Sequence, residues 1–290
     1  MHIKLPEAKT YLPGAGRCIY CWPNRTTTDD LRREHIIPGA LGGKLVLHKA
    51  SCLECAALIN REIETPTLGQ TWVDPRTHLK MKTSKPRYTL RIGRWNSDCG
   101  EMPQNLSDPA CEFEFEEVPV DIHPFCIVAP QFAPPGILDD REPTESFLVV
   151  RAHAFADFEK FANFPKKEGT HVGIFQPFNP QTICRSVAKI AHGAAVAELG
   201  LNAFEPLLPD IILGKSKLVS HLIGHSQSRG LPADQMHRIA LSLRQGYVIA
   251  TVQLFAKYRI QPFLAVVGIA SPRLSAWHMS STITDSATPR

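Results

Sequence analysis

The chain has 290 residues, of which 43% are hydrophobic and 21% are charged. This composition is typical of a globular protein and excludes a disordered or fibrous chain. The net charge of +4 is unevenly distributed, because residues 1–95 hold 16 of the 32 Lys and Arg residues but only 8 of the 28 Asp and Glu residues. This local excess of positive charge favours a polyanionic partner such as nucleic acid.

Two stretches bear on localisation. Residues 1–6 lack the apolar segment of a secretory signal. The most apolar late stretch, residues 246–270, is interrupted by polar and charged side chains, so it cannot form a membrane-spanning helix. We therefore expect a cytoplasmic protein with no membrane partner.

The first 95 residues predict the order strand, strand, helix. Residues 32–38 form an extended run that ends at a proline, and residues 44–50 are rich in strand formers. The turn Leu41-Gly42-Gly43 between them predicts a hairpin.

A helix is predicted to follow the hairpin. Ser51 is a suitable N-cap residue and Glu54 stands three positions later, as in a capping box. We expect Pro66 and Gly69 to end this helix.

The rest of the chain reads as an acidic, proline-containing linker at residues 96–110, a second domain at residues 111–278 and a frayed tail at residues 279–290. The predicted elements of the second domain are strands at residues 111–118, 146–155 and 171–175, helices at residues 181–200 and 233–245, and two apolar runs at residues 247–255 and 263–270. The histidines of this domain lack metal-ligand spacing, and we interpret His221 and His225 as surface residues.

Four of the eight cysteines form two C-x-x-C pairs, Cys18 with Cys21 and Cys52 with Cys55, separated by thirty residues. Four thiolates suit a tetrahedral zinc ion. Such a site has no open coordination position and would be structural. The alternatives are incidental buried cysteines or a redox pair, but neither pair lies in a thioredoxin-like pattern.

The region between and around these pairs resembles an HNH endonuclease. The resemblance rests on the two cysteine pairs, on Glu34-His35-Ile36-Ile37-Pro38 and Leu41-Gly42-Gly43, and on Ala50-Ser51 before Cys52. It covers roughly residues 15–95, and residues 185–214 look like the tails of bacterial HNH proteins. It implies an α+β protein in which an N-terminal zinc-braced ββα-metal (treble-clef-like) domain, residues 1–95, precedes a mixed α/β domain.

The resemblance also implies a mechanism. His35 would be the general base that activates water, and Glu34 would be a catalytic residue and a ligand of a catalytic Mg²⁺ or Mn²⁺. His35 could instead be a structural histidine or a spare zinc ligand.

The sequence departs from the family pattern at Ala56, where the last letter of the HNH motif is expected and where alanine cannot bind a metal. At the position where the motif has its middle asparagine, this sequence has Leu47. We assign Asn60, one helical turn after Ala56, to the catalytic cation. The remaining candidates are Glu62, Glu64 and His48, each of which could also be a simple exposed polar residue.

A basic segment follows the predicted nuclease region. We interpret it as a strip that contacts phosphates, or else as a solvated face. Tyr88 and Trp95 lie near it and could stack on bases or belong to a core. Its cations are Arg76, Lys80, Lys82, Lys85, Arg87, Arg91 and Arg94.

The sequence thus predicts a zinc-containing, metal-dependent endonuclease that hydrolyses DNA without sequence specificity. The alternative is a catalytically inactive, zinc-stabilised DNA-binding module, which Ala56 favours. A third interpretation has the C-terminal domain bind a ligand or a protein partner and gate the nuclease. The oligomeric state is left open.

Overall fold

The computed structural model describes residues 1–3, 5–21, 30–83, 87–99, 113–145, 149–156, 159, 164, 167–174, 179–226 and 234–274. The elements up to residue 99 are β1 (His2–Ile3), β2 (Thr10–Leu12), β3 (Arg32–His35), the 3₁₀ turn η1 (Gly39–Leu41), β4 (Leu45–Ser51), α1 (Leu53–Ile59), the π-helical segments η2 (Asn60–Glu64) and η3 (Thr67–Thr71), α2 (Val73–His78), β5 (Thr89–Asn96) and η4 (Ser97–Cys99). The later elements are β6 (Phe113–Pro119), β7 (Cys126–Phe132), η5 (Gly136–Leu138), β8 (Val149–Ala156), β9 (Thr170–Gly173), α4 (Pro180–Leu199), β10 (Phe204–Pro206), α5 (Pro209–Ile212), α6 (Val219–Leu222), β11 (Ile223–His225), β12 (Arg238–Arg244), β13 (Tyr247–Gln253), η6 (Ala256–Tyr258) and β14 (Phe263–Ala270). The predicted mixture of helices and sheets is confirmed.

The predicted hairpin is present in the N-terminal region. β3 pairs antiparallel with β4, and β2 joins the other edge of β4 in parallel, which gives the order β2-β4-β3. The helix after it begins at Leu53 with Cys52 as N-cap, and no side chain caps it.

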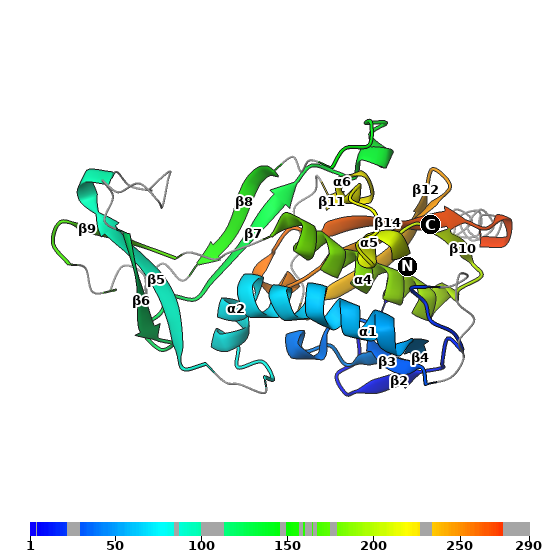
Figure 1. The fold of residues 1–290 in the computed structure, drawn as a ribbon, viewed down its shortest axis with the longest axis horizontal. Coiled ribbons are helices and arrows are strands. Elements are labelled where there is room, and N and C mark those ends of the chain that lie inside the picture. The colour runs from blue at the N-terminus through cyan, green and yellow to red at the C-terminus, as the bar shows by residue number, and fades with distance from the viewer. Residues whose placement is uncertain are drawn as a thin grey trace, which may run out of the picture.

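The predicted end of this helix is wrong. The chain stays helical through Pro66 and Gly69 and continues into α2 (Figure 1). Wide π-turns on both sides of Pro66 form hydrogen bonds five residues apart, as from Trp72 N–H to the Thr67 carbonyl. These turns let the helix continue past a residue that cannot donate a backbone hydrogen bond.

The helix predicted at residues 233–245 is also wrong, because residues 238–244 form β12. Ile239 and Leu241 are buried and the residue between them is half-exposed. Burial of every second residue is typical of a strand. β12 pairs antiparallel with β13 through a two-residue turn at Gln245 and Gly246, whose φ values of 55° and 78° suit a tight hairpin.

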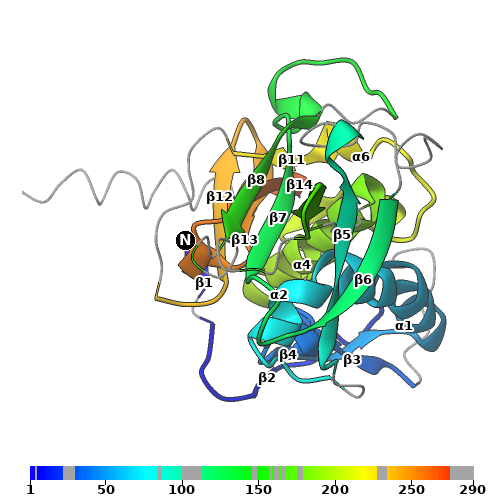
Figure 2. The same cartoon turned by 90° about the vertical axis from the view of Figure 1, so that its left-hand side faces the viewer.

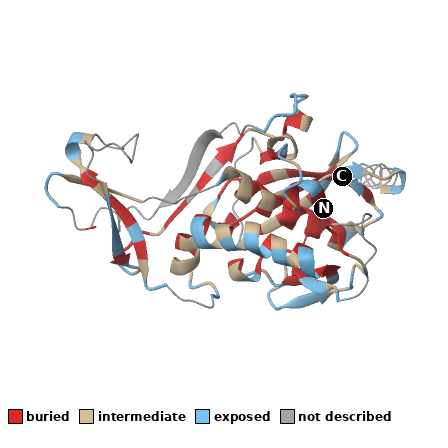
Figure 3. Ribbon diagram, viewed as in Figure 1, coloured by how far each residue is buried: buried red, intermediate tan, exposed pale blue. Residues whose placement is uncertain are grey.

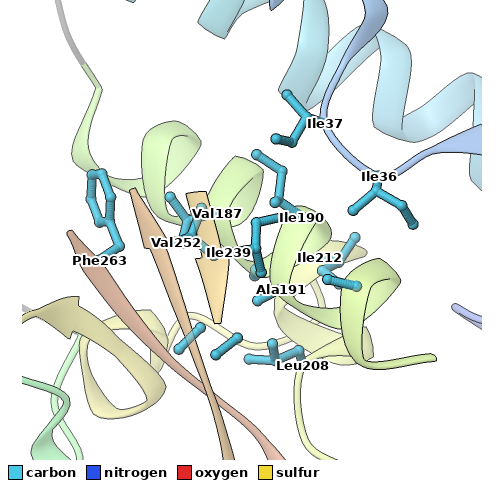
Figure 4. Close-up of a cluster of buried hydrophobic side chains, with 14 of the residues drawn as sticks. Ile36, Ile37, Val187, Ile190, Ala191, Leu208, Ile212, Ile239, Val252 and Phe263 are labelled. Carbon is cyan, nitrogen blue, oxygen red and sulfur yellow. The ribbon is translucent and has the colours of Figure 1, made fainter. Parts of the chain in front are cut away.

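The main body is a sheet covered on one face by α4. The sheet has the order β1-β12-β13-β14-β10, with β11 also paired to β14. α4 packs against β13 and β14 and, on its other side, against η2 and η3 of the N-terminal region. Buried side chains of α4, such as Val187 and Ile190, lie between Ile36 of the N-terminal region and Val252 of the sheet (Figure 4).

One hydrophobic core therefore runs through both parts of the chain. Its members extend from Ile3 to Phe263 and beyond, and β1 pairs with β12 of the sheet. The buried positions concentrate in α4 and the strands beneath it (Figure 3). The division into domains at residue 95 stays a prediction, but packing is continuous across it.

A second, smaller sheet stands at the far end of the molecule (Figures 1 and 2). It has the order β6-β5-β9, and Ile92, Val118 and Phe164 form a small core of their own. The two-stranded β7–β8 ribbon leads from it toward the main body. β5, at the end of the predicted N-terminal domain, thus pairs with strands beyond the predicted linker.

Most of that linker, from residue 100, and the whole predicted tail, residues 279–290, lie outside the described residues. In the part of the chain that is described, no helix has the length and apolar character needed to cross a membrane.

Candidate functional site

The four cysteines of the two C-x-x-C pairs come together. Their sulfur atoms all lie within 4.8 Å of one another, and Cys21 Sγ and Cys52 Sγ are 3.9 Å apart. The first pair follows β2, and the second is placed by the end of β4 and the start of α1. Cys18, Cys52 and Cys55 are buried.

The chemistry of these thiols fits a bound zinc ion. A hydrogen bond from Cys55 is the largest cause that lowers the pKa of Cys18, to about 4, and the backbone N–H groups of Tyr20, Cys21 and Cys52 also favour its thiolate. Burial and the neighbouring sulfurs raise the pKa of Cys21 to about 12. The cluster therefore holds its full negative charge only with a cation at its centre, and Cys18, Cys21, Cys52 and Cys55 would hold zinc there.

The two glycines of the Leu41-Gly42-Gly43 turn have separate structural reasons. Gly42 has a φ of 83°, a left-handed conformation that favours glycine. A Cβ on Gly43 would lie 1.8 Å from the carbonyl oxygen of Ile37, so any side chain would collide with the backbone. The turn is also held from outside, because His237 Nε2 lies 2.6 Å from the Leu41 carbonyl oxygen.

β3 sends neighbouring side chains to opposite sides. Glu34 is buried and points toward α4, where its Oε1 lies 2.6 Å from Nζ of Lys189. The same Nζ lies 3.0 Å from Oε1 of Glu64 and donates to the backbone carbonyl of His35. Lys189 is only 1% exposed, so a single buried ammonium group contacts two carboxylates and the backbone carbonyl of His35.

The charge state of this cluster follows from its geometry. Burial acts to lower the pKa of Lys189, but Glu34 and Glu64 outweigh it and raise that pKa. Burial raises the pKa of Glu34, and Lys189 opposes this effect. Lys189 therefore stays protonated at neutral pH.

α4 contacts the N-terminal region at further points on the same side. Arg185, one turn before Lys189, forms an ion pair with Glu62 at 3.2 Å. His192, one turn after Lys189, lies 2.7 Å from the Ile19 carbonyl oxygen through its Nε2. Residues spaced three to four apart share a helix face, so one face of α4 holds the predicted nuclease region.

The ring of His35 lies on the other side of the sheet. It is half-buried beside Gly39, whose added Cβ would lie 3.5 Å from His35 Nε2. Burial is the largest cause that lowers the pKa of His35, and the cations Lys9, Lys189 and Arg33 add to it. The imidazole is therefore neutral at pH 7 and able to accept a proton.

A cationic and aromatic surface surrounds this imidazole. Tyr11 and His35 both stand opposite Val46 in the sheet, and Tyr11 is 45% exposed. Lys9 Nζ lies 5.4 Å and Arg33 Cζ 5.9 Å from the centre of this ring, and the His48 ring lies 4.9 Å away. We call this surface the Tyr11 face, formed by Lys9, Tyr11, Arg33, His35 and His48.

The residues predicted for the catalytic cation lie in different surroundings. Glu34 is buried in its ion pair with Lys189, whereas Asn60 is exposed where α1 ends. Ala56 offers no ligand atom. Among the described residues, the four cysteines are the one group of three or more His, Cys, Asp or Glu side chains close enough to share a metal. A divalent cation on Glu34 and Asn60 therefore does not fit this arrangement.

The predicted basic strip is divided between two places. Arg76 belongs to α2, where its guanidinium donates to the carbonyls of Ala40 and Leu68. Lys80 and Lys82 are exposed just after this helix. Lys85 lies outside the described residues.

The remaining cations of the strip lie on or next to the small sheet β6-β5-β9, which we call the distal sheet. Arg94 is paired with Glu116 at 2.9 Å, and Arg91 lies over the Phe115 ring at 4.3 Å. Arg87 is exposed before β5, next to Tyr88, which is 79% exposed, whereas Trp95 is a core residue at 4%.

Sequence reasoning missed several residues of the site. Nothing in the N-terminal sequence indicates Lys189, which lies more than 150 positions from Glu34. Lys9, Tyr11 and Arg33 precede or overlap the motif but carry no signature of their own. The interpretation of His225 as a surface residue is wrong, because it is 2% exposed and its Nδ1 accepts a hydrogen bond from the Phe132 N–H.

A comparison with protein families decides the nature of the N-terminal region. Residues 18–70 match the model of the HNH endonuclease family. The match includes both cysteine pairs, Glu34 and His35, so the resemblance inferred from the motif is confirmed for this region. No curated protein and no solved structure matches the chain. An HNH nuclease domain implies a nucleic-acid substrate.

Proposed function

We propose that the protein is an endonuclease that hydrolyses DNA phosphodiester bonds, with His35 as the general base. The half-buried, neutral imidazole of His35 at the edge of the cationic Tyr11 face carries this proposal. A base must be deprotonated before it can take a proton from water, and the lowered pKa of His35 supports that state at neutral pH.

The Tyr11 face supports a polyanionic substrate next to this base. Lys9 and Arg33 are exposed, and within the described residues neither forms an ion pair with a carboxylate. Both cations are therefore free to neutralise phosphates, and Tyr11 offers a ring on which a base could stack. This arrangement would bind the sugar-phosphate backbone of the nucleic acid, without base-specific contacts.

The step assigned to His35 is the removal of a proton from the attacking water as its oxygen forms a bond to phosphorus and the bond to the leaving oxygen breaks. We assign no step to a divalent cation, because Glu34 is already paired with Lys189 and Asn60 is exposed. The cation requirement that the family resemblance implies is included in the test below.

A second candidate function is a zinc-stabilised DNA-binding module without catalysis. Two observations favour it: Ala56 replaces a residue of the motif, and Glu34 is held by Lys189. Both functions use the same zinc site and the same Tyr11 face. They differ in whether His35 acts on a phosphodiester bond.

A plasmid-nicking assay at low salt separates the two functions. The zinc-loaded wild type is compared with His35→Ala, each in Mg²⁺, in Mn²⁺ and in EDTA. Nicking by the wild type that is lost at least a hundredfold in His35→Ala, with DNA binding retained, is the expected result. Equal nicking by both proteins would contradict the role of His35, and binding without nicking in either would favour the second function.

A further inference from the structure

The cluster of Lys189, Glu34 and Glu64 has a chemistry that neither the zinc site nor the proposed base uses. It places one positive charge between two carboxylates at the strand that carries His35. Two carboxylates around one centre are also what a hard divalent cation needs. The ligand that this structure provides for them is an ammonium group from α4.

We propose that the ammonium group of Lys189 is a built-in cation that occupies the carboxylate site at Glu34 in place of a divalent metal. Glu34 then acts as a positioning residue for His35 and not as a metal ligand. The proposal rests on the proposed function only for the identity of the site, since the ion pairs themselves are independent of activity.

Three geometric facts support this assignment. Lys189 is almost completely buried, so its charge cannot reach a substrate phosphate and serves only the groups around it. Its nitrogen contacts three separate acceptors, which are Glu34, Glu64 and the His35 carbonyl, and thus uses the donor capacity of an ammonium group. These acceptors come from two different elements, β3 and η2.

The consequence for His35 is mechanical. Lys189 holds the backbone carbonyl of His35 and the side chain of its neighbour Glu34, so α4 fixes the end of β3. The ion pair of Arg185 with Glu62 fixes η2 next to it. The helix of the C-terminal part thereby completes a site whose motif lies wholly in the N-terminal part.

Binding of Mn²⁺ to the zinc-loaded, full-length protein tests the proposal, with free Mn²⁺ measured by electron paramagnetic resonance. The wild type, Glu34→Gln, Lys189→Ala and the double variant are compared, and Glu62→Gln is the matched control. We expect Glu34→Gln and Glu62→Gln to bind Mn²⁺ as the wild type does. Lys189→Ala should gain one Mn²⁺ site, whose affinity is at least tenfold higher than any binding of Mn²⁺ by the wild type. The double variant Lys189→Ala with Glu34→Gln should lose that site.

The outcomes decide between a lysine and a metal at Glu34. A wild-type Mn²⁺ site that weakens tenfold or more in Glu34→Gln would overturn the proposal, and so would a folded Lys189→Ala that gains no site. If Lys189→Ala does not fold, the comparison of wild type with Glu34→Gln still decides, because it keeps Lys189. Failure of the nicking assay would leave these binding results unchanged, so the two proposals fail separately.

Discussion

β3 separates two environments that differ in how charge is handled. On its inner side, Glu34 is buried and balanced by Lys189 of α4. On its outer side, Arg33 and the ring of His35 join Lys9 and Tyr11 in a surface that is open to solvent. Charge on the inner side is used to hold the fold together, and charge on the outer side is available to a ligand.

This comparison changes the interpretation of the motif. Glu34 and His35 are neighbours in sequence and would ordinarily be assigned one shared task. Because successive side chains of a strand point to opposite faces, the structure gives the first residue to the packing against α4 and the second to the exposed surface. Four sets of substitutions would test this separation, and the one with the largest expected effect disrupts both sides of β3.

The largest effect is expected from loss of the four-cysteine site, where a zinc ion would hold the segments on both sides of β3 together. We expect the wild type to bind one zinc ion per chain and Cys55→Ser to lose it, because three thiolates bind zinc less well than four. Structural zinc contributes on the order of 10 kcal/mol in small domains, so we expect loss of cooperative folding in the N-terminal region. Elemental analysis and limited proteolysis measure both results.

Cys184→Ala is the control for this experiment. Cys184 is a buried free thiol of α4 that lies outside the cluster, so its variant should keep the zinc. Full zinc content in Cys55→Ser would contradict the four-cysteine site.

The inner side alone is broken by Lys189→Met. Removing one partner of a buried ion pair leaves uncompensated charge and costs about 3–5 kcal/mol of unfolding free energy. The double variant Lys189→Met with Glu34→Gln should recover part of this loss, because it removes that charge as well. Urea denaturation measures the free energies.

An exposed lysine provides the comparison. Lys217, whose side chain is 68% exposed and lies 3.9 Å from Glu145, should change stability by no more than about 0.5 kcal/mol when replaced by Met. If the two substitutions lowered the free energy of unfolding equally, the buried ion pairs of Lys189 would contribute no more to stability than an exposed ion pair.

The turn that follows β3 also makes stability depend on pH, through His237. Burial lowers the pKa of His237 to about 4, and its Nε2 contacts the Leu41 carbonyl at the turn after β3. Because burial disfavours the charged imidazolium, the folded protein binds the proton less readily than the unfolded chain does. The stability of the fold is therefore fully present above about pH 6.5 and decreases as the pH falls toward 4. The loss amounts to about 3 kcal/mol.

His237→Gln isolates the part of the stability that depends on protonation of His237, because an amide can donate to the Leu41 carbonyl but does not titrate. Urea denaturation at pH 7 and pH 4.5 should show a larger loss for the wild type than for the variant. Zinc loss at low pH acts on both proteins, so their difference isolates His237. Parallel pH profiles would contradict the prediction.

The sequence predicted the outline of the site but not its surroundings. The cysteine spacing, the β3–β4 hairpin and His35 were accessible, because short-range patterns determine zinc knuckles and hairpins. The role of Glu34 was not, because its partner Lys189 comes from a helix that only the tertiary fold brings near. β12 is too short for its alternating burial to distinguish a strand from a helix in the sequence. Sequence rules place a helix end at Pro66 because they do not anticipate the π-turns that carry the helix past it.

The smallest effects are expected on the outer side, where they separate the Tyr11 face from the predicted basic strip. Arg33→Ala should lower the slope of DNA affinity against salt by about 1, because it removes one phosphate contact. Arg94→Ala should leave the slope unchanged, because Glu116 already neutralises that guanidinium at 2.9 Å. Tyr11→Ala should lower affinity by about 1 kcal/mol without changing the slope, since stacking releases no counterions. Fluorescence anisotropy with a labelled DNA over a range of salt concentrations measures all three. A reduced slope in Arg94→Ala with none in Arg33→Ala would place the DNA on the distal sheet, and would remove the Tyr11 face from the substrate site while leaving the inner side of β3 as described.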